Sequence, residues 1–294
     1  MAKTGCMLCP RRCNVDRASG ERGFCGAGND LIIGRYGLHQ WEEPCISGKN
    51  GSGTVFFSHC TLRCLYCQNY AISTKMQGRK ITPQQLCDIF LELQNNGAHN
   101  INLVTPTHFA VQIISALELA KMRGLTLPVV YNTGGYERVE TLKMLEGYVD
   151  IYLPDLKYYR SEYAKKYSAA PDYFQIACAA IAEMARQVLP AKYDENGLMQ
   201  RGLIVRHLLL PGLLYDAKKI VDYLYKNYAN DVTISLMSQY TPLEQVKDMP
   251  PLNHTVGAHE YQILCDYAAS IGVENAYVQD GSAAKESFIP DFYT

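Results

Sequence analysis

A chain of 294 residues with 48% hydrophobic side chains is long enough to bury the core of one large α/β domain, with or without a small appendage. Its 28 basic and 29 acidic residues nearly cancel, so no excess of positive charge indicates a nucleic-acid or anionic-membrane partner. The first five residues are polar, and no apolar run approaches the roughly 20 residues of a membrane span. We therefore expect a soluble, cytoplasmic protein.

The first segment, residues 1–53, is rich in Gly, Arg and Cys and shows little apolar periodicity. Eight of the 11 cysteines lie within the first 67 residues, and because the cytosol keeps thiols reduced, this clustering indicates metal rather than disulfides. Cys6, Cys9, Cys13 and Cys25 supply four thiols that suit either structural zinc or an auxiliary iron-sulfur cluster. A metal-free role in substrate handling stays open. We predict a small Cys-rich, metal-binding appendage over residues 1–53.

From about residue 54 onward, short β-branched or aromatic runs alternate with longer helical patterns, which is typical of βα units around a parallel sheet. A helix is expected between Thr82, a suitable N-cap, and Gly97, and others over residues 110–122 and 217–228, with two more inside 158–202. The strands are predicted over residues 54–58, 100–104, 128–132, 149–153, 203–209 and 232–237. This rhythm predicts a partial (β/α)6 TIM-like barrel over residues 54–294, with its ligands at the C-terminal ends of the strands.

Directly after the first predicted strand, Cys60, Cys64 and Cys67 follow the spacing Cys-x3-Cys-x2-Cys. A 4Fe-4S cluster normally takes four thiolates, so three leave one iron open for a small molecule. Structural zinc is the alternative, and it requires a fourth ligand such as His59. The position at a strand end and the aromatic Tyr66 before the last cysteine favour the cluster.

These residues resemble the signature of radical S-adenosylmethionine (radical SAM) enzymes. The flanking sequence, 51–58 and 67–70, is similar to that of a subgroup related to pyruvate formate-lyase activating enzyme. The resemblance implies that the open iron binds SAM through its amino and carboxylate groups, that an electron from the cluster breaks the S–C5′ bond, and that the 5′-deoxyadenosyl radical abstracts hydrogen. It also implies an electron donor such as flavodoxin or ferredoxin, and a protein or peptide substrate.

Residues after the later strands match further family elements. Asn132 and Thr133 match an Asp-Thr pair near the SAM carboxylate, and the change from Asp to Asn weakens any claim to the monovalent cation site of activating enzymes. Asp155 and Lys157 match an Asp-Leu-Lys element that flanks SAM, with a capping or salt-bridge role as the alternative. Arg206 begins a run similar to the family's Arg-x-x-x-x-Pro-Gly, which implies charge-assisted hydrogen bonds to the SAM carboxylate.

The largest departure follows the second strand, where the wider superfamily carries Gly-Gly-Glu or Gly-Gly-Asp to receive the SAM amino group. This chain has Thr105, Thr107 and His108 there, and its 134–135 Gly-Gly pair comes one strand too late. We expect Thr105, Thr107 or a backbone carbonyl to accept the amino group and His108 to contact the ligand, although a lone histidine is more often structural. At the end of the sixth strand, Gln239 and its neighbours are candidates for adenine or substrate contacts, or for core packing.

Three functional hypotheses remain. The first is an activating enzyme that abstracts hydrogen from the backbone of a glycyl radical enzyme, and it depends on the resemblance alone. The second is radical SAM modification of a small molecule or a peptide side chain, which the altered Gly-Gly-Glu position suggests. The third is a non-catalytic iron-sulfur binding protein that no longer turns SAM over, motivated by the same change together with Asn132.

Overall fold

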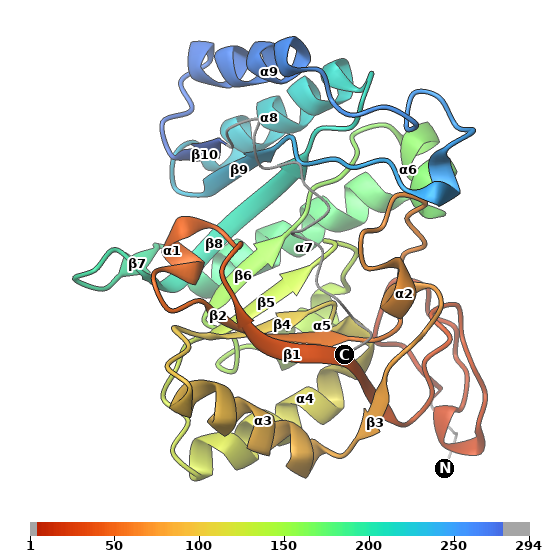
Figure 1. Ribbon diagram of the computed structural model, residues 1–294, viewed down its shortest axis with the longest axis vertical. Coiled ribbons are helices and arrows are strands. Elements are labelled where there is room, and N and C mark those ends of the chain that lie inside the picture. Colours follow the sequence, from red (N-terminus) through yellow and green to blue (C-terminus); the bar gives the residue numbers. More distant parts are fainter. Residues whose placement is uncertain (1–4, 279–294) are drawn as a thin grey trace.

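A computed structural model describes residues 5–278 and shows one long twisted sheet flanked by helices (Figure 1). In this described part of the chain the strands lie in the order β10-β9-β8-β6-β5-β4-β2-β1-β3, with β7 paired to β8. The outer ends of the two predicted domains, residues 1–4 and 279–294, lie outside the described residues. The domain boundary between residues 53 and 54 stays a prediction.

The strands predicted in the barrel are all present and run parallel to one another. They are β2 (Ser52–Phe57), β4 (Ile101–Val104), β5 (Val129–Thr133), β6 (Ile151–Pro154), β8 (Met199–Leu208) and β9 (Thr233–Met237). The parallel sheet, with helices between its strands, confirms the predicted α/β fold of a partial TIM-like barrel. Its parallel strands also place their C-terminal ends at one edge, where a ligand site is expected.

Sequence reasoning missed the remaining strands of the described chain, which are short or lie at an edge. Two of them, β1 and β3, extend the sheet in antiparallel sense beyond β2, so part of the 1–53 segment belongs to the sheet itself. They are β1 (Leu31–His39), β3 (Arg79–Ile81), β7 (Lys192–Tyr193) and β10 (Ala276–Val278).

The predicted helices are confirmed. Pro83–Asn95 forms α3, which begins after a capping box in which the Thr82 side chain accepts from Gln85 N–H and the Gln85 side chain accepts from Thr82 N–H. The others predicted are α4 (Ala110–Met122), α6 (Ser161–Ser168), α7 (Tyr173–Val188) and α8 (Leu214–Tyr228). The structure adds α1 (Pro44–Ser47), α2 (Tyr70–Ser73), α5 (Val139–Met144) and α9 (Ala258–Ser270).

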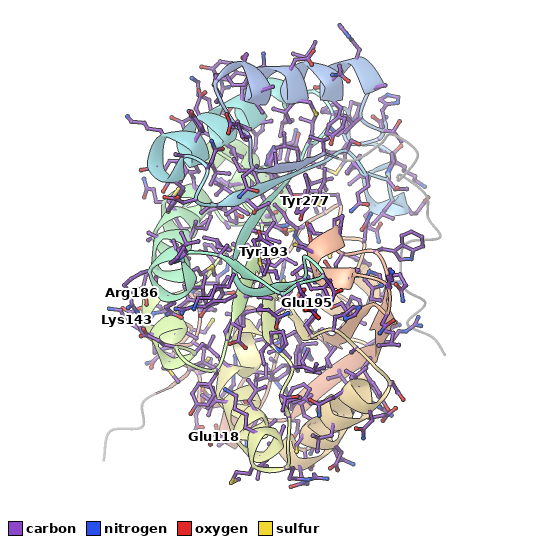
Figure 2. All side chains as sticks on the ribbon, turned by 90° about the vertical axis from the view of Figure 1, so that its left-hand side faces the viewer. Glu118, Lys143, Arg186, Tyr193, Glu195 and Tyr277 are labelled. Carbon is purple, nitrogen blue, oxygen red and sulfur yellow. The ribbon has the colours of Figure 1, made fainter. Side chains whose placement is uncertain are left out.

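The helices cover the outer face of the sheet and seal its core. Leu86, Phe90 and Leu93 on α3 are buried against the strands and α4, and burying each such side chain contributes roughly 1.5–3 kcal/mol. Charged residues face outward, as Lys143 on α5 and the half-exposed Arg186 on α7 show (Figure 2). The described residues contain no helix with the length and apolarity needed to cross a membrane.

The capping box gives a direct test of the α3 assignment. Replacing Thr82 by Ala removes the acceptor for Gln85 N–H, so the free energy of unfolding of the apo-protein should fall by about 1 kcal/mol in urea titrations. Thr82→Ser keeps a hydroxyl at the cap and should stay close to the wild type. Equal losses for both variants would contradict the capping role.

Candidate functional site

A cavity of about 260 Å³ opens at the C-terminal ends of the parallel strands. It brings together most of the residues predicted from the sequence: Cys60, Cys64, Tyr66, Cys67, Thr105, Asn132, Thr133, Asp155, Lys157, Arg206 and Gln239. It is also lined by residues that sequence reasoning did not select: His39, Trp41, Glu42, Phe56, Leu62, Gln68, Asn69, Val104, Gly134, Leu208 and Met237. One pocket therefore gathers the ends of β2, β4, β5, β6, β8 and β9.

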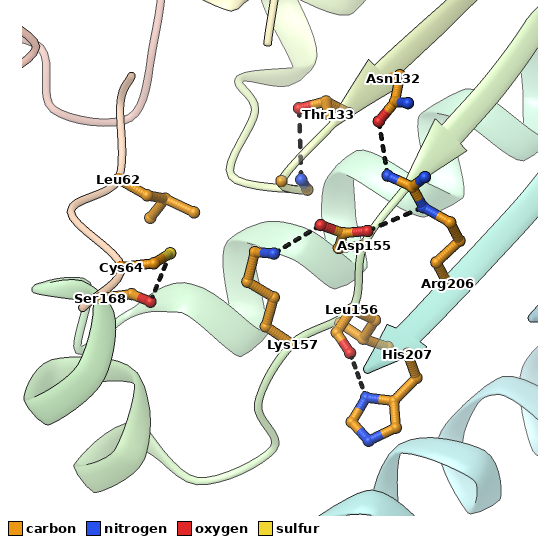
Figure 3. Close-up of polar contacts among 12 residues, drawn as sticks. Leu62, Cys64, Asn132, Thr133, Asp155, Leu156, Lys157, Ser168, Arg206 and His207 are labelled. Atoms are coloured by element: carbon orange, nitrogen blue, oxygen red, sulfur yellow. Dashed lines mark hydrogen bonds and ion pairs between the residues drawn. The ribbon is translucent and has the colours of Figure 1, made fainter. Parts of the chain in front are cut away.

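Cys60, Cys64 and Cys67 are half-buried in the loop between β2 and α2. The loop begins at His59, whose φ of 72° turns the chain sharply out of β2, a conformation of the kind that clusters at functional sites. Each sulfur accepts a hydrogen bond: Cys60 from Leu62 N–H at 3.3 Å, Cys64 from Ser168 Oγ at 2.9 Å (Figure 3), and Cys67 from Ser73 Oγ at 3.3 Å. These donors favour the thiolate form that a metal centre requires.

Burial is the main reason that the pKa of each of these thiols is raised. Burial and then the neighbouring thiol of Cys64 raise the pKa of Cys67 to about 11, and burial with Cys64 and Cys67 raises the pKa of Cys60 still further. The positive charge of Lys157 offsets this burial only in part, so the thiols stay protonated at neutral pH unless more positive charge is bound. A bound iron core would supply that charge and hold them as thiolates, so the donor set fits an iron-sulfur cluster with one open position.

Opposite this loop, Arg206 on β8 joins a wall of partly buried charges (Figure 3). Its Nε donates to Asp155 Oδ1 at 3.0 Å, its Nη2 to Asn132 Oδ1 at 2.6 Å and its Nη1 to Glu42 Oε2 at 3.2 Å. Lys157 Nζ donates to the other oxygen of Asp155 at 2.6 Å. Burial alone would raise the pKa of Asp155, but the charges of Lys157 and Arg206 outweigh it and lower that pKa.

Glu42 reaches this wall from the segment before α1 and completes it. Burial raises the pKa of Glu42, and the charge of Arg206 only partly offsets this. The Oε1 atom of Glu42 accepts from Asn102 Nδ2 at 3.1 Å and from Asn132 Nδ2 at 3.3 Å. No strand end or motif marked this residue in the sequence. Its one signal was the adjacent acidic pair with Glu43 just before a proline.

Two of the residues predicted to contact SAM do not line the cavity. Thr107 lies behind it, where its Oγ1 donates to Glu137 Oε1 at 2.5 Å. His108 is fully buried, its Nε2 lies 2.7 Å from Ser58 O, and burial lowers its pKa to about 3, so the ring is neutral. These contacts favour the structural role for His108 that the sequence left open.

Glu137 is the buried anchor behind the β5 end of the pocket. It is 2% exposed, and the hydroxyls of Thr107 and Thr133 both donate to Oε1. Burial raises the pKa of Glu137 to about 7, although these hydrogen bonds pull it down. Because Thr133 also lines the cavity, the carboxyl group fixes one wall of the site.

The 134–135 Gly-Gly pair serves packing. Gly135 has a φ of 77°, and a Cβ there would lie 2.2 Å from Asp155 O, so only glycine fits. The Tyr173 hydroxyl lies within hydrogen-bonding distance of Gly134 O, at 2.8 Å, and Asp155 O, at 2.7 Å, and accepts from Lys157 N–H at 3.0 Å. This hydroxyl thereby ties the ends of β5 and β6 together beside the charged wall.

The four N-terminal cysteines lie outside the cavity lining. Cys9 and Cys25 are buried, whereas Cys6 and Cys13 are half-buried. Burial raises the pKa of Cys9 to about 12, and the nearby thiols of Cys25 and Cys6 add to this. In neither group of cysteines, within the part of the chain that the structure describes, do three or more potential ligands converge as they would around a single metal ion.

With this geometry established, comparisons with known proteins identify the family. The family model of the radical SAM superfamily matches residues 54–224, which is more than half of the chain. The chain belongs to the radical SAM superfamily. Membership implies a 4Fe-4S cluster and SAM as its cofactors.

The sequence identities to individual proteins are low. The chain is 29% identical to the uncharacterized protein MJ0674 of Methanocaldococcus jannaschii over 282 residues, which cover 92% of this chain and 76% of that protein. Streptococcus suis SuiB bound to S-adenosylmethionine is 12% identical with a TM-score of 0.48, over 75% of this chain and 48% of SuiB. The FeFe-hydrogenase maturase HydG from Carboxydothermus hydrogenoformans is 14% identical with a TM-score of 0.45, over 74% of this chain and 56% of HydG. The chain thus spans about half the length of these two solved proteins.

The raised pKa of Glu137 predicts a pH-dependent stability difference. Between its usual value of 4.5 and about 7, the folded apo-protein keeps a proton that the unfolded chain has lost, so the free energy of unfolding falls as pH rises through this window. The full effect is about 3 kcal/mol. Glu137→Gln cannot ionise, so its stability relative to the wild type should improve by up to that amount between pH 5 and pH 7.5 in urea titrations.

The matched control is Glu162→Gln, an acid-to-amide change at an exposed position on α6. Its stability relative to the wild type should stay nearly constant between the same two pH values. A constant difference between Glu137→Gln and the wild type would refute the buried, proton-holding carboxyl.

Proposed function

We propose that Cys60, Cys64 and Cys67 hold the 4Fe-4S cluster of a radical SAM enzyme and leave one iron open to SAM. A reduced cluster held there would supply the electron that cleaves SAM to methionine and a 5′-deoxyadenosyl radical able to abstract hydrogen from a substrate. The observation that carries this proposal is the set of three hydrogen-bonded thiols facing one cavity. The charged wall of Arg206, Asp155 and Lys157 lines the same cavity.

The charged wall matches the polar groups of SAM in kind. Arg206 and Lys157 are cations beside the cavity, which suits the SAM carboxylate, and Asp155 holds both of them in place. Asn132 stands at the position of the lost aspartate of activating enzymes, and here its side chain accepts a hydrogen bond from the Arg206 guanidinium. Thr105 lines the cavity with a φ of 60°. We propose that it accepts the SAM amino group in place of the missing Gly-Gly-Glu run.

The substrate proposed is the backbone of a protein or peptide, with activation of a glycyl radical enzyme as the specific reaction. The support is the likeness to pyruvate formate-lyase activating enzymes around the three-cysteine loop, in the 155–157 Asp-Leu-Lys element and in the 206–212 run that ends in Pro-Gly. In this reaction the 5′-deoxyadenosyl radical takes one hydrogen atom from a glycine Cα, leaving 5′-deoxyadenosine and a glycyl radical.

The first experiment tests SAM cleavage itself. Wild-type protein and a Cys60/Cys64/Cys67→Ala variant are reconstituted anaerobically with iron and sulfide, reduced with dithionite, and assayed for 5′-deoxyadenosine from SAM. We expect product from the wild type and only background from the variant. A Cys87/Cys178/Cys265→Ala variant changes three thiols outside both cysteine groups and should retain the activity. A wild type that assembles its clusters and gives no 5′-deoxyadenosine would favour the non-catalytic iron-sulfur protein.

A second experiment tests the substrate class. The reconstituted enzyme is incubated with SAM, reductant and the glycyl radical enzyme pyruvate formate-lyase, and electron paramagnetic resonance is recorded. The proposal predicts a glycyl radical signal on the partner, with 5′-deoxyadenosine formed in equal amount. SAM cleavage that is unchanged by this protein but stimulated by a small molecule or a peptide would favour the alternative, which is modification of a small molecule or a peptide side chain.

A further inference from the structure

The segment that carries the N-terminal cysteines folds back on itself. Cys6 N–H donates to Val15 O at 2.8 Å, and Asn14 N–H donates back to Cys6 O at 3.0 Å. Between them, Arg12 N–H donates to Cys9 O at 3.1 Å, and both Arg12 and Asn14 take left-handed backbone conformations, with φ of 44° and 54°. This double reversal returns the chain to the level of Cys6 just after Cys13.

The segment that follows brings the fourth thiol, that of Cys25, toward Cys13. Phe24 N–H donates to Cys13 Sγ at 3.2 Å, and a Cβ on Gly23 would lie only 2.8 Å from that sulfur, so the backbone packs directly on the thiol. Next in the chain, Cys25 is 5% exposed, and Arg17 Nη2 lies 3.6 Å from its sulfur. Backbone and guanidinium donors thus already point at two of the four sulfurs.

This segment has almost no apolar core of its own. Among residues 5–30, the buried hydrophobic side chains are Cys9, Cys25 and Ala27. A segment this small normally needs a disulfide or a metal to hold its fold, because it cannot bury enough apolar surface. All the cysteines in the described residues are free thiols. The thiols therefore occupy the position where a stabilising metal centre would lie.

The same segment is docked on the three-cysteine loop. Arg11 Nε donates to Thr61 O at 3.1 Å, and in the opposite direction Arg63 Nη2 donates to Phe24 O at 2.9 Å. The guanidinium groups of Arg11 and Arg63 lie 3.8 Å and 4.4 Å from the centre of the Phe24 ring. Figure 1 shows this segment, in red, beside α2 at the end of the sheet that holds the loop. Arg17 also provides positive charge beside the thiol of Cys25.

We propose that Cys6, Cys9, Cys13 and Cys25 hold a second iron-sulfur cluster, packed against the loop of the first. A structural zinc ion needs four ligands at about 2.3 Å from one point. In the described residues no three potential ligands converge on one point in either cysteine group. Because the N-terminal segment packs directly on the loop assigned to the first cluster, its placement favours a redox-active cluster over zinc, and in this one respect the inference rests on the proposed function.

The test is the metal content of full-length protein reconstituted anaerobically, measured as iron, acid-labile sulfide and zinc. Two 4Fe-4S clusters correspond to about eight irons per chain. We expect about eight in the wild type and in the Cys87/Cys178/Cys265→Ala control. About four are expected in Cys9/Cys25→Ala, and about four in Cys60/Cys64/Cys67→Ala.

Spectroscopy of the reduced variants separates the two sites without any activity measurement. In Cys9/Cys25→Ala, addition of SAM should change the electron paramagnetic resonance spectrum, because the remaining cluster has an open iron. In Cys60/Cys64/Cys67→Ala, the spectrum should not respond to SAM, because four cysteines close the remaining cluster.

The Cys60/Cys64/Cys67→Ala variant tests for the second cluster even if Cys9/Cys25→Ala fails to fold. Iron-free Cys60/Cys64/Cys67→Ala protein, or a wild type with about four irons and one zinc per chain, would overturn the proposal. Eight irons without 5′-deoxyadenosine would instead count against the proposed function and leave the second cluster standing.

Discussion

Arg206 carries a positive charge into a site that is largely closed to water, and much of the surrounding structure consists of the groups that neutralise it. Asp155, Asn132 and Glu42 each accept from a different guanidinium nitrogen. They come from three separate parts of the chain, so one side chain fixes the relative positions of β5, β6, β8 and the segment before α1. Removing one partner of this partly buried network destabilises the site, because the remaining charge is left uncompensated.

A second network fixes the three-cysteine loop from behind. The hydroxyls of Tyr66 and Tyr158 are 2.6 Å apart, Tyr158 pairs with Ser168 Oγ at 2.7 Å, and Ser168 donates to Cys64 Sγ. Tyr66 also packs edge-on against Tyr240. The aromatic residue of the signature thus supports the loop through its hydroxyl as well as its ring. Hydrogen bonds to ligating sulfurs are among the factors that set the reduction potential of a cluster, so under the proposed function Ser168 would tune the cluster although it lies far from the cysteines in the sequence.

The parts of the structure that the sequence predicts depend on local signals. Thr82 and Pro83 define the start of α3, and β-branched runs locate the parallel strands, because capping and alternation act between close neighbours. The cysteine spacing and the strand ends then place half of the residues that line the cavity. Glu42, Ser168 and Glu137 were not selected, because their contacts join residues far apart in the chain or lie behind the pocket wall. The β1 strand was missed because its apolar run is interrupted by Gly34, Arg35 and Gly37 within a Cys-rich segment.

Hydrogen bonds from arginine side chains to main-chain carbonyls attach the N-terminal segment to the rest of the molecule. Arg11 donates to the carbonyls of Thr61 and Ala169, Arg17 to that of His108, and Arg63 to that of Phe24. Every acceptor is a main-chain oxygen, which is present whatever side chain the residue carries. Apart from Phe24, whose ring also contacts Arg11 and Arg63, these acceptor residues can therefore change without removing the hydrogen bonds that the arginines donate. An insertion or deletion that moves the backbone would disturb this attachment more than most substitutions.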